Sequence, residues 1–448
     1  MNYLQSIAYI ESLAPTLLNP SLERMALFMA ESGQLQDSVP AIHVGGTNGK
    51  GSTVSMLDSV LRLAGLSVGR FTGPHLLRWN ERFHVNGKPI GDADFAHLAT
   101  DLRELSEQFE RRHRQFGRLS WFEFLTAMAF FLFAREAVDI AVVEVGLGGR
   151  WDATNVLTRP LCVAITTVEL DHTHILGSTV QEIAREKSGI IKAGVPVVTA
   201  AYGEALAEIE LRASAVGAQV VRCLPLPAVS DSLAGDKDAF NESCVRLSLA
   251  GAHQRLNARV ARATLACCQP ALPPGVESAF SEGLSHVYWP GRLQYLPGSN
   301  LVLDGAHNVS GAKALRQALD TLFPGRRRIF VMGFFQNKDV PGVLAELIGQ
   351  DDRVFVSEAA TSRPVYASSD VVALLSGQEI QAIPCNSIQA ALNCALAERR
   401  SDDLVIAAGS FATVKEVMLG LGWQCVEDGI SGTFSNWDGT CSTASSHS

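Results

Sequence analysis

Short apolar runs alternate with longer segments of helical periodicity along most of the chain. An apolar run at residues 41–44 is followed by a glycine-rich turn, and apolar residues then recur at helical spacing across 54–61. Near-continuous β-branched runs at 138–145 and 161–167 are typical of parallel strands that are buried on both faces. This alternation predicts an α/β fold, in which a mostly parallel sheet is flanked by helices.

The same patterns predict the other elements in the first part of the chain. Two short helices are expected within residues 3–30, broken near 15–20, with Asn19 or Ser21 as a cap. Residues 72–82 are expected to form a long irregular loop, and such loops are usually functional. Residues 224–250 give no clear pattern. The other expected strands lie at 66–71, 195–199 and 219–223. The other expected helices lie at 94–112, 120–136 and 180–191, from after 199 to about 215, at 251–268, and in a short segment after Pro274.

The alternation starts again after a Trp-Pro-Gly-Arg segment at 289–292, which we expect to be a hinge. The chain is therefore expected to divide into a larger domain at 1–288 and a smaller, Rossmann-like α/β domain at 289–428. Residues 429–448 are rich in Ser, Thr and Gly and are expected to be disordered. In the smaller domain we expect strands at 300–303, 328–332, 353–357 and 404–408, and helices at 309–322, 341–348, 386–398 and 411–420.

Composition and charge exclude several classes of function. The 448 residues are enough for two domains, and the net charge of −9 argues against non-specific nucleic-acid binding. The nine cysteines show no metal-binding spacing, which favours reduced thiols in the cytoplasm. The N-terminus lacks the features of a signal peptide, and the most apolar run, 124–134, is too short to span a bilayer. We therefore expect a cytoplasmic protein that binds neither nucleic acid nor membrane.

The turn Gly-Gly-Thr-Asn-Gly-Lys-Gly-Ser-Thr at 45–53 is the strongest local signal. Between a strand and a helix, glycines let backbone N–H groups converge on a phosphate, and the helix N-terminus adds partial positive charge. Lys50 can reach the β- and γ-phosphates, and a hydroxyl just beyond it can bind Mg²⁺. The spacing departs from the usual phosphate-binding loop, because Gly51 stands where Ser or Thr normally follows the lysine. The competing interpretation is a tight turn with a surface lysine.

Three neighbouring strand ends carry side chains that suit this chemistry, namely Lys50, Glu144 and His172. Ligands of open parallel sheets bind outside the carboxyl ends of the strands, so these side chains are expected to converge. Glu144 would bind Mg²⁺, with a structural carboxylate as the alternative, and His172 is either a second metal ligand or a structural histidine. Because no Ser-His-Asp set indicates a protein nucleophile, the pattern favours phosphoryl chemistry in which the substrate attacks ATP.

Several longer stretches occur in a specific order along residues 15–422. They are GGTNGKGST (45–53), GPHLLRWNERF (73–83), EVGLGGRWDATN (144–155), LDHTHILG (170–177), REKSGIIK (185–192), PGRLQ (290–294), LDGAHN (303–308) and GSFATV (409–414). With these stretches the chain resembles folylpolyglutamate synthase/dihydrofolate synthase, a family of Mur-ligase-like, P-loop-containing amide-forming enzymes. So many ordered matches are far more specific than a phosphate loop alone.

The resemblance implies a reaction and its cofactors. ATP would phosphorylate a pterin-linked carboxylate, and the amine of L-glutamate would then displace phosphate from the acyl phosphate. The acceptor would be dihydropteroate, the γ-carboxyl of tetrahydrofolate, or both. The implied cofactors are ATP and two Mg²⁺ ions, and closure of the second domain would complete the site. The partners would be small molecules only, and the protein would be a monomer.

The resemblance also implies which residues form the site. Glu144 and His172 would hold Mg²⁺, with Ser52 or Thr72 completing its shell, and a carbamylated Lys187 would hold the second ion. The catalytic residues would be Lys50, Lys187 and His307. The nucleotide would contact Thr47, Asn48, Gly49, Lys50, Gly51, Ser52, Asn257, Arg292 and Asp304. The substrates would contact Ser120, Phe122, Trp151, Asp152, Ala153, His307 and Ser410.

Two positions depart from the family pattern. Family members commonly carry a metal-binding serine before the Pro-His-Leu of the long loop, where this chain has Gly73. Bacterial members that bind dihydropteroate often carry aspartate at the position of Asn19. The first departure leaves a metal ligand to be supplied by Thr72, Ser52 or water, and the second weakens the expectation of pteroate addition.

Three alternatives stay open at this point. The chain could be a folylpolyglutamate synthase without dihydrofolate synthase activity. It could be another Mur-type amino-acid ligase acting on a UDP-sugar peptide, although residues 1–40 leave little room for a uridine-binding domain. It could also be a non-enzymatic nucleotide-dependent switch or scaffold, although such a protein would not need Lys50, Glu144, His172 and Lys187 together.

Overall fold

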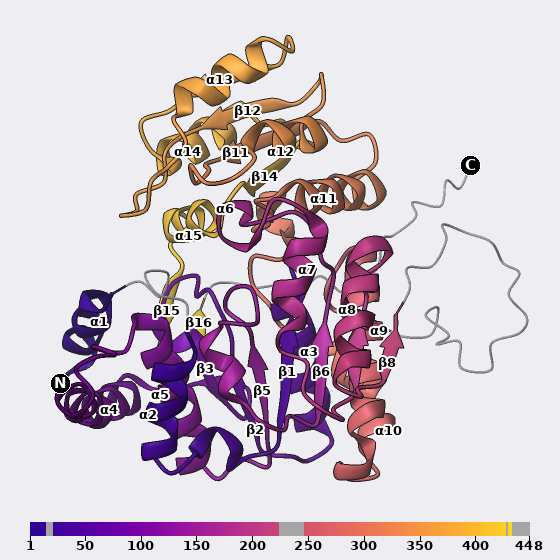
Figure 1. The fold of residues 1–448 in the computed structure, drawn as a ribbon. Coiled ribbons are helices and arrows are strands. Elements are labelled where there is room, and N and C mark those ends of the chain that lie inside the picture. Colours follow the sequence, from indigo (N-terminus) through magenta and orange to yellow (C-terminus); the bar gives the residue numbers. More distant parts are fainter. Residues whose placement is uncertain (15–20, 224–245, 427–428, 432–448) are drawn as a thin grey trace, which may run out of the picture. The chain divides into compact units, whose positions relative to one another are not determined.

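The computed structural model describes residues 1–14, 21–223, 246–426 and 429–431 (Figure 1). The chain divides into two compact units. Asn19, most of 224–250 and residues 432–448 of the expected tail lie outside the described residues. The expected domain boundaries at 288 and 428 remain a prediction. Unit 1 comprises Met1–Ser243, Leu256–Leu284 and Val426–Gly429, and unit 2 comprises Cys244–Arg255, Ser285–Cys425 and Ile430–Ser448.

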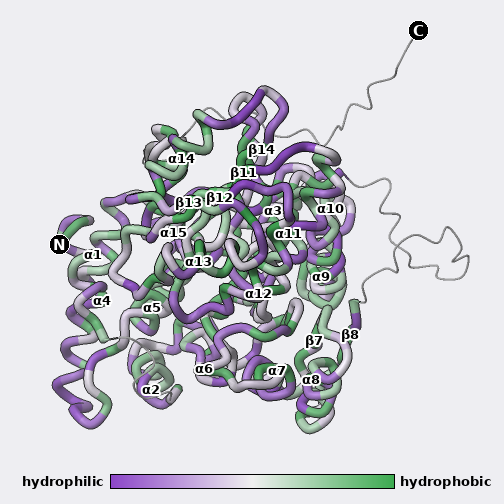
Figure 2. The backbone as a smooth tube through the Cα atoms, turned by 90° about the horizontal axis from the view of Figure 1, so that it is seen from above, coloured by the Kyte–Doolittle hydropathy of each residue, from purple (hydrophilic) through white to green (hydrophobic). Residues whose placement is uncertain are grey.

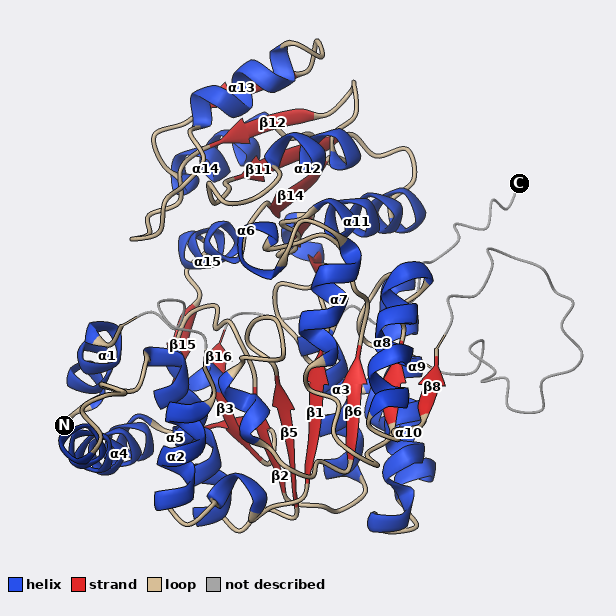
Figure 3. Ribbon diagram, viewed as in Figure 1, coloured by secondary structure: helices blue, strands red, loops and turns tan. Residues whose placement is uncertain are grey.

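Unit 1 is built on an eight-stranded sheet with the order β4-β3-β2-β5-β1-β6-β7-β8 (Figure 3). The β2–β3 and β3–β4 pairs are antiparallel, and the other neighbours are parallel. All residues of β1, β5 and β6 are buried, which explains their near-continuous apolar sequences. The strands are β1 (Ala41–Gly45), β2 (Val68–Phe71), β3 (Phe83–Val85), β4 (Lys88–Pro89), β5 (Ile140–Glu144), β6 (Cys162–Ile165), β7 (Val197–Thr199) and β8 (Val220–Arg222).

Helices cover both faces of this sheet, as β2 shows. Gly69 lies under the Phe133 ring of α5, because a Cβ at Gly69 would come within 2.4 Å of that ring. The next residue, Arg70, points to the opposite face, where it contacts Ser55 and Asp58 of α3. The helices in this part of the chain are α1 (Tyr3–Ser12), α2 (Glu23–Glu31), α3 (Lys50–Leu63), α4 (Asp92–Arg112), α5 (Trp121–Arg135), α6 (Thr173–Leu176), α7 (Val180–Ser188), α8 (Gly203–Ala215), α9 (Ala252–Cys268) and α10 (Val276–Ser285).

The apolar helix α5 is buried in a large core cluster, as its sequence predicts. Ser120 caps it in a capping box with Glu123, whose carboxylate also pairs with Arg24 of α2 at 2.6 Å. The longer α4 is amphipathic, and Figure 2 shows hydrophobic and hydrophilic stretches alternating along it. Among the described residues, no helix combines the length and the apolar character that crossing a membrane requires.

Unit 2 is built on a six-stranded sheet with the order β13-β12-β11-β14-β10-β9, in which only β9 runs antiparallel to its neighbour. A two-stranded sheet, β15 (Gln424–Val426) with β16 (Gly429–Ser431), lies at the end of the described chain. The strands of the main sheet are β9 (Gln294–Leu296), β10 (Leu301–Leu303), β11 (Arg328–Met332), β12 (Arg353–Val356), β13 (Gln381–Pro384) and β14 (Leu404–Ala408), and the helices are α11 (Val309–Leu322), α12 (Val340–Leu347), α13 (Ser368–Ser376), α14 (Ile388–Glu398) and α15 (Phe411–Gly420).

The mixed α/β fold with two sheets confirms the predicted fold class. The sequence patterns missed β3, β4, α6, β9, α13, β13 and β15, and each of the missed strands is only two to four residues long. They also missed that the expected tail begins with a strand, since β16 starts at Gly429. The long loop expected at 72–82 contains a short 3₁₀ helix at Trp79–Arg82.

Candidate active site

The glycine turn joins β1 to α3, and its backbone conformation requires glycine at two positions. Gly46 and Gly49 have φ values of 130° and 84°, which lie in the region that side chains disfavour. A Cβ at Gly46 would come within 1.9 Å of the Thr166 hydroxyl, and a Cβ at Gly49 within 2.3 Å of Asn257 Oδ1. Helix α3 begins at Lys50, so its first N–H groups lie at this turn, as a phosphate-binding loop requires.

Hydrogen bonds to the segment after β6 hold the turn in shape. We call the four residues that form them the loop latch: Thr47 and Asn48 of the turn, and Thr166 and Glu169 of the segment. The Thr166 hydroxyl donates to the backbone carbonyls of Gly45 and Asn48 at 3.1 and 2.7 Å. Glu169 accepts from the Asn48 amide at 3.0 Å, and its backbone exchanges hydrogen bonds with the Thr47 hydroxyl. The phosphate loop is therefore fixed by the strand that leads to His172. Thr166 has no distinctive sequence signal, so the sequence did not indicate this role.

Two lysines converge on the same carbonyl of the turn. Lys50 Nζ donates to the Gly46 carbonyl at 3.2 Å, and Lys187 Nζ donates to it at 2.8 Å. Lys187 lies on α7 and is buried. Burial, together with the charge of Lys50, lowers the pKa of Lys187 to about 7. Near neutral pH a large share of this amine is therefore unprotonated and able to act as a nucleophile.

Glu144 ends β5, and the parallel pairing of β5, β1 and β6 makes the three expected strand ends neighbours. Its buried carboxylate accepts a hydrogen bond from the Gly73 backbone at 3.2 Å. His172 is the residue before α6 and has a φ of 52°, and its Nε2 lies 3.9 Å from Asp171 Oδ1. Among the described residues, no three His, Cys, Asp or Glu side chains form a ready metal site.

Of the two residues expected to complete the first metal shell, Thr72 lies beside a buried arginine, Arg82. Ser52 is buried in the first turn of α3, and the Thr72 hydroxyl donates to the Glu81 carbonyl at 3.5 Å. A side chain at Gly73 would meet Arg82, whose Nη1 lies 2.7 Å from the position of the added Cβ. Burial lowers the pKa of Arg82 to about 10, and its guanidinium lies 5.5 Å from the ring centres of Trp79 and Trp121. Arg82 therefore occupies space that a serine at position 73 would need, and the sequence alone did not indicate this.

The expected pterin-pocket residues have different surroundings. Phe122 is buried against Gly146, where a Cβ would come within 2.2 Å of its ring. Trp151 is 41% exposed, and the Arg150 guanidinium lies 4.7 Å from the centre of its ring. The exposed indole and the buried phenyl ring each have a flat apolar face of the kind that can pack against a ring system.

Asp152 is held inside its own loop. Its carboxylate accepts from the Leu147 and Thr154 backbones at 2.9 and 3.0 Å and from the Thr154 hydroxyl at 2.5 Å. Burial raises the pKa of Asp152. Thr154 in turn lies 2.8 Å from His43 Nε2 on β1, and burial lowers the pKa of His43 to about 3. Because Thr154 gives its only proton to Asp152, the neutral His43 ring donates through Nε2. These hydrogen bonds connect the loop that carries Trp151 and Ala153 to the central strand β1.

Unit 2 carries the remaining expected residues at the carboxyl ends of β10 and β14. The Asp304 carboxylate accepts from the backbones of Leu293 and Ala306, both at 2.7 Å. The Arg292 guanidinium lies 4.6 Å from the Phe411 ring centre. His307 Nδ1 donates to the Gly305 carbonyl at 2.7 Å, and Ser410 caps α15. The Nδ1 donation makes Nε2 the basic nitrogen of a neutral His307.

The chain is similar to proteins of one enzyme family. The Mur ligase glutamate ligase domain model matches residues 291–411. The dihydrofolate synthase/folylpolyglutamate synthase of Bacillus subtilis is 37% identical over 348 residues, which cover 74% of this chain and 79% of the relative. The enzyme of the same description from Mycobacterium tuberculosis is 35% identical over 401 residues, covering 81% of this chain and 79% of the relative.

Solved structures show the same similarity. Mycobacterium tuberculosis folylpolyglutamate synthase complexed with ADP has a TM-score of 0.82 at 29% identity, covering 93% of this chain and 97% of that chain. E. coli FolC in complex with DHPP and ADP has a TM-score of 0.80 at 28% identity, covering 94% and 97%. The bifunctional enzyme of Yersinia pestis, complexed with AMPPNP and a Mn ion, also has a TM-score of 0.80 at 28% identity, covering 94% and 98%.

Proposed function

The chain belongs to the folylpolyglutamate synthase/dihydrofolate synthase family and is an ATP-dependent folate–glutamate ligase, and we propose that it forms the amide through an acyl phosphate at the glycine turn. The observation that carries this mechanism is the joint approach of Lys50 and Lys187 to the Gly46 carbonyl. This approach combines a phosphate-binding cation with an amine whose pKa is lowered to about 7.

The nucleotide would bind through backbone N–H groups of the turn, with Lys50 beside its terminal phosphates. Asn257 lies against Gly49, at the distance at which it can contact the same ligand. From unit 2, Arg292 and Asp304 are the proposed further contacts. ADP or an ATP analogue is present in the solved relatives, which supports ATP as the phosphate donor.

The residues present fit a divalent metal. Glu144 is a buried carboxylate, His172 follows the neighbouring strand, and Ser52 or Thr72 supplies a hydroxyl. The lowered pKa of Lys187 gives the unprotonated amine that reaction with CO₂ needs, and the resulting carbamate would offer oxygen ligands for a second ion. A bound Mg²⁺ would neutralise charge on the transferred phosphoryl group. The Mn ion in the Yersinia pestis relative supports a divalent metal.

The chemistry needs no protein nucleophile. A carboxylate oxygen of the folate or pteroate attacks the γ-phosphorus of ATP, the bond to the bridging oxygen breaks, and ADP leaves. The glutamate ammonium first loses a proton, and its amine nitrogen then attacks the acyl carbon. The adduct loses a second proton, and phosphate leaves as the amide forms. We assign acceptance of a proton from the glutamate ammonium to His307 Nε2, since Nδ1 donates to Gly305. Ser410 is the proposed second contact to glutamate.

The pterin would lie against Phe122 and the exposed face of Trp151, with Ser120, Asp152 and Ala153 shaping the pocket. The contacts of Asp152 within its own loop favour a positioning role, because both of its oxygens are already engaged. Dihydropteroate and reduced folate share the pterin, so the pocket by itself allows either acceptor. The relatives include enzymes described with both activities and with one.

The proposal is tested by measuring glutamate-dependent ADP release with dihydropteroate and with tetrahydrofolate as acceptors. Release with both acceptors would show a bifunctional enzyme, and release with one would assign the single activity. If ADP release with both acceptors stays at the rate measured without glutamate, the folate assignment is overturned. Trapping the reaction with hydroxylamine should convert the acyl phosphate to a hydroxamate before glutamate is added, and no hydroxamate would contradict the intermediate.

A further inference from the structure

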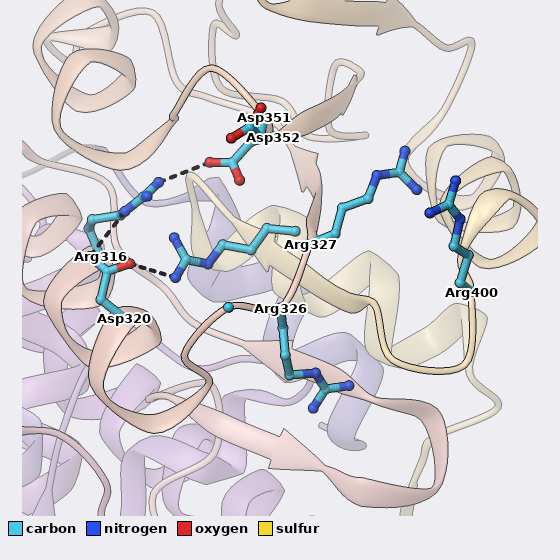
Figure 4. A pocket seen from close by; sticks show the side chains of 9 residues that line it. Arg316, Asp320, Arg326, Arg327, Asp351, Asp352 and Arg400 are labelled. Carbon is cyan, nitrogen blue, oxygen red and sulfur yellow. Dashed lines mark hydrogen bonds and ion pairs between the residues drawn. The ribbon is translucent and has the colours of Figure 1, made fainter.

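Three arginines are almost fully buried in the described part of the chain, and two of them have a carboxylate partner. Arg70 Nη1 of β2 lies 3.1 Å from Asp58 Oδ2. Arg328 Nη2 of β11 lies 2.5 Å from Oδ1 of Asp320, which lines the pocket drawn in Figure 4. The third is Arg82, which is 6% exposed and has no ion-pair partner among the described residues. A buried charge without a partner is costly, so the fold alone does not explain a charged side chain here.

Arg82 uses only one nitrogen of its guanidinium for hydrogen bonds within the described structure. Its Nε donates to His75 Nδ1 at 2.9 Å. The N–H groups on Nη1 and Nη2 donate to no acceptor among the described residues. A guanidinium presents these donors in a rigid plane whose spacing matches the two oxygens of a carboxylate. The outer edge of the Arg82 guanidinium is therefore suited to bind an anion.

Two carboxylates influence the charge of Arg82 without pairing with it. Glu81 accepts from three successive backbone N–H groups of its own loop at 2.6 to 2.7 Å, and these bonds occupy both of its oxygens. Glu144 accepts from the Gly73 backbone and is a proposed metal ligand. Burial lowers the pKa of Arg82 to about 10, and the charges of Glu144 and Glu81 favour its protonated form. Arg82 therefore stays positively charged at neutral pH.

Aromatic rings and the backbone at Gly73 are neighbours of this guanidinium. Its central carbon lies 5.5 Å from the ring centres of both Trp79 and Trp121. Trp121 is the first residue of α5, and its ring centre lies 5.5 Å from that of Phe122, a residue of the proposed pterin pocket. Nη1 lies 2.7 Å from the position of a Cβ added at Gly73, and the Gly73 N–H donates to the proposed metal-binding carboxylate. The charge is therefore close to both the pterin pocket and the metal site of the proposed reaction.

We propose that Arg82 is a substrate-binding residue whose Nη1 and Nη2 groups hold a carboxylate of the pteroate or folate acceptor. The acceptor carries its flat pterin at one end and its carboxylate at the other, so a cation near both the aromatic pocket and the metal site lies where the acyl end should reach. Binding there would offset the buried charge and fix the acyl end for its attack on ATP. The inference rests on the proposed function. Dihydropteroate has one carboxylate and reduced folate has an α- and a γ-carboxylate, so binding of the two acceptors distinguishes which group Arg82 holds.

The test measures binding to the full chain by isothermal titration in the absence of ATP, so that no reaction takes place. The probes are pteroate, its neutral carboxamide and tetrahydrofolate. The wild type should bind pteroate more tightly than the carboxamide. Arg82→Met removes the charge and keeps an apolar stem beside the two indoles, and it should lower this preference at least about tenfold. Arg82→Lys keeps the charge without the planar fork and should retain part of the preference.

Arg78→Gln is the matched control. Arg78 precedes the short 3₁₀ helix that ends at Arg82, and its guanidinium is paired with Asp92. The control removes the same charge from the same loop and should keep the preference for pteroate. If Arg82 had only a structural role, Arg82→Met would melt at a lower temperature, and pteroate and its carboxamide would lose affinity by the same factor. The ratio of the two affinities therefore separates binding of a carboxylate from stability.

A lowered preference of Arg82→Met for pteroate over the carboxamide would assign the reacting carboxylate to Arg82. Unchanged affinities for these two probes, together with at least about tenfold weaker binding of tetrahydrofolate, would assign the α-carboxylate of folate. If Arg82→Met keeps the wild-type affinity for all three probes, or loses affinity for the acid and the amide equally, the role of Arg82 is overturned while the proposed function stands. If the wild type binds none of the probes, the proposed function fails, and this inference fails with it.

Discussion

At the scale of single residues, the phosphate loop depends on positions where a side chain cannot be placed. At Gly46 both the positive φ and the 1.9 Å approach of an added Cβ to Thr166 exclude alanine. Gly65 also has a positive φ, of 90°, but an added Cβ there meets no atom within 4 Å. Alanine variants at the two positions therefore separate the effect of backbone strain from the effect of a steric clash.

We expect Gly46→Ala to lower glutamate-dependent ADP release by about 100-fold, because the displaced turn no longer positions the phosphates. Gly65→Ala, just after the end of α3, should cost about 1 kcal/mol in the free energy of unfolding, because alanine disfavours the positive φ, and should keep the activity. Steady-state ADP release and urea denaturation of both variants measure these effects. Equal activity of the two variants would show that the turn at Gly46 tolerates displacement.

Lys187 makes the stability of the chain depend on pH. Its pKa is about 7 in the folded chain, against 10.5 for an ordinary lysine. Between these values the unfolded chain binds a proton that the folded chain does not. The free energy of unfolding therefore rises with pH across this window, by at most about 1.4 kcal/mol per pH unit from this group. Below the folded pKa, the cost of burying the charged amine is fully present.

The Lys187→Met variant should show a shallower rise of the free energy of unfolding between about pH 7 and pH 9.5. Denaturation in bicarbonate-free buffer measures it, because carbamylation would change the charge of the wild-type group. The same variant should lose ADP release, since neither the amine nor its carbamate remains. Matching pH slopes for the variant and the wild type would contradict the assigned burial of the charge.

At the scale of elements, the loop latch joins the glycine turn to the segment that follows β6. Glu169 contributes its carboxylate to Asn48 and its backbone to Thr47, so it fixes two successive residues of the turn. The latch acts by positioning, because its groups bond to the loop and not to a phosphate. Its loss should therefore affect nucleotide binding more than the chemical step.

Glu169→Ala should raise KM for ATP about tenfold with a smaller change in kcat, because the loop is no longer held in its binding conformation. Glu169→Gln keeps an oxygen that can accept from Asn48 and should recover most of the affinity. Glu208→Ala, which removes the partly buried partner of the exposed Arg185, serves as the control and should leave KM unchanged. An unchanged KM in Glu169→Ala would show that the turn keeps its shape without the latch.

A comparison of two helix-capping serines tests whether Ser120 contacts the substrate as well as stabilising its helix. Ser120 caps α5 and Ser387 caps α14, each accepting from a backbone N–H of the first turn. Replacing either with alanine should cost about 1 kcal/mol in the free energy of unfolding. Only Ser120→Ala should also raise KM for the folate acceptor. A KM that stays the same in both variants would limit Ser120 to its structural role.

At the scale of the whole molecule, the sequence predicted the buried parallel strands and the edge of the sheet at which they end, and it missed the short strands at the edges of the sheets. β1, β5 and β6 are buried along their full length, so their sequences are continuous apolar runs. The end of such a run placed the end of β5 at Glu144. β9 and β13 are three and four residues long and only partly buried, so their sequences carry no such run. The apolar pattern of a sequence reflects how deeply its residues are buried, and edge strands are buried only in part.

The candidate site was predictable for a similar reason. Lys50 and Glu144 adjoin buried strands and could be placed from local patterns, whereas the roles of Thr166 and Arg82 arise from contacts between distant segments. Thr166 reaches the turn from another strand, and Arg82 fills the space beside Gly73. Contacts between residues that are far apart along the chain leave no local pattern in a single sequence.

Metal removal gives a prediction for the complete protein. Excess EDTA should stop ADP release, and Mg²⁺ added in excess over EDTA should restore it, because phosphoryl transfer needs a cation to neutralise the developing charge. Far-UV circular dichroism should stay unchanged throughout, since the proposed ions bind at the site and not within a core. Undiminished ADP release in EDTA would rule out the proposed role of Glu144 and His172.

The margins of the two sheets also bear on how the protein behaves at high concentration. One edge strand of each sheet ends in proline, β4 as Lys88–Pro89 and β13 as Gln381–Pro384. Proline offers no N–H for a further strand to pair with, and a charged residue at an edge discourages a second chain from adding to the ladder. The same short strands that sequence patterns overlooked therefore protect these two edges against strand-by-strand aggregation.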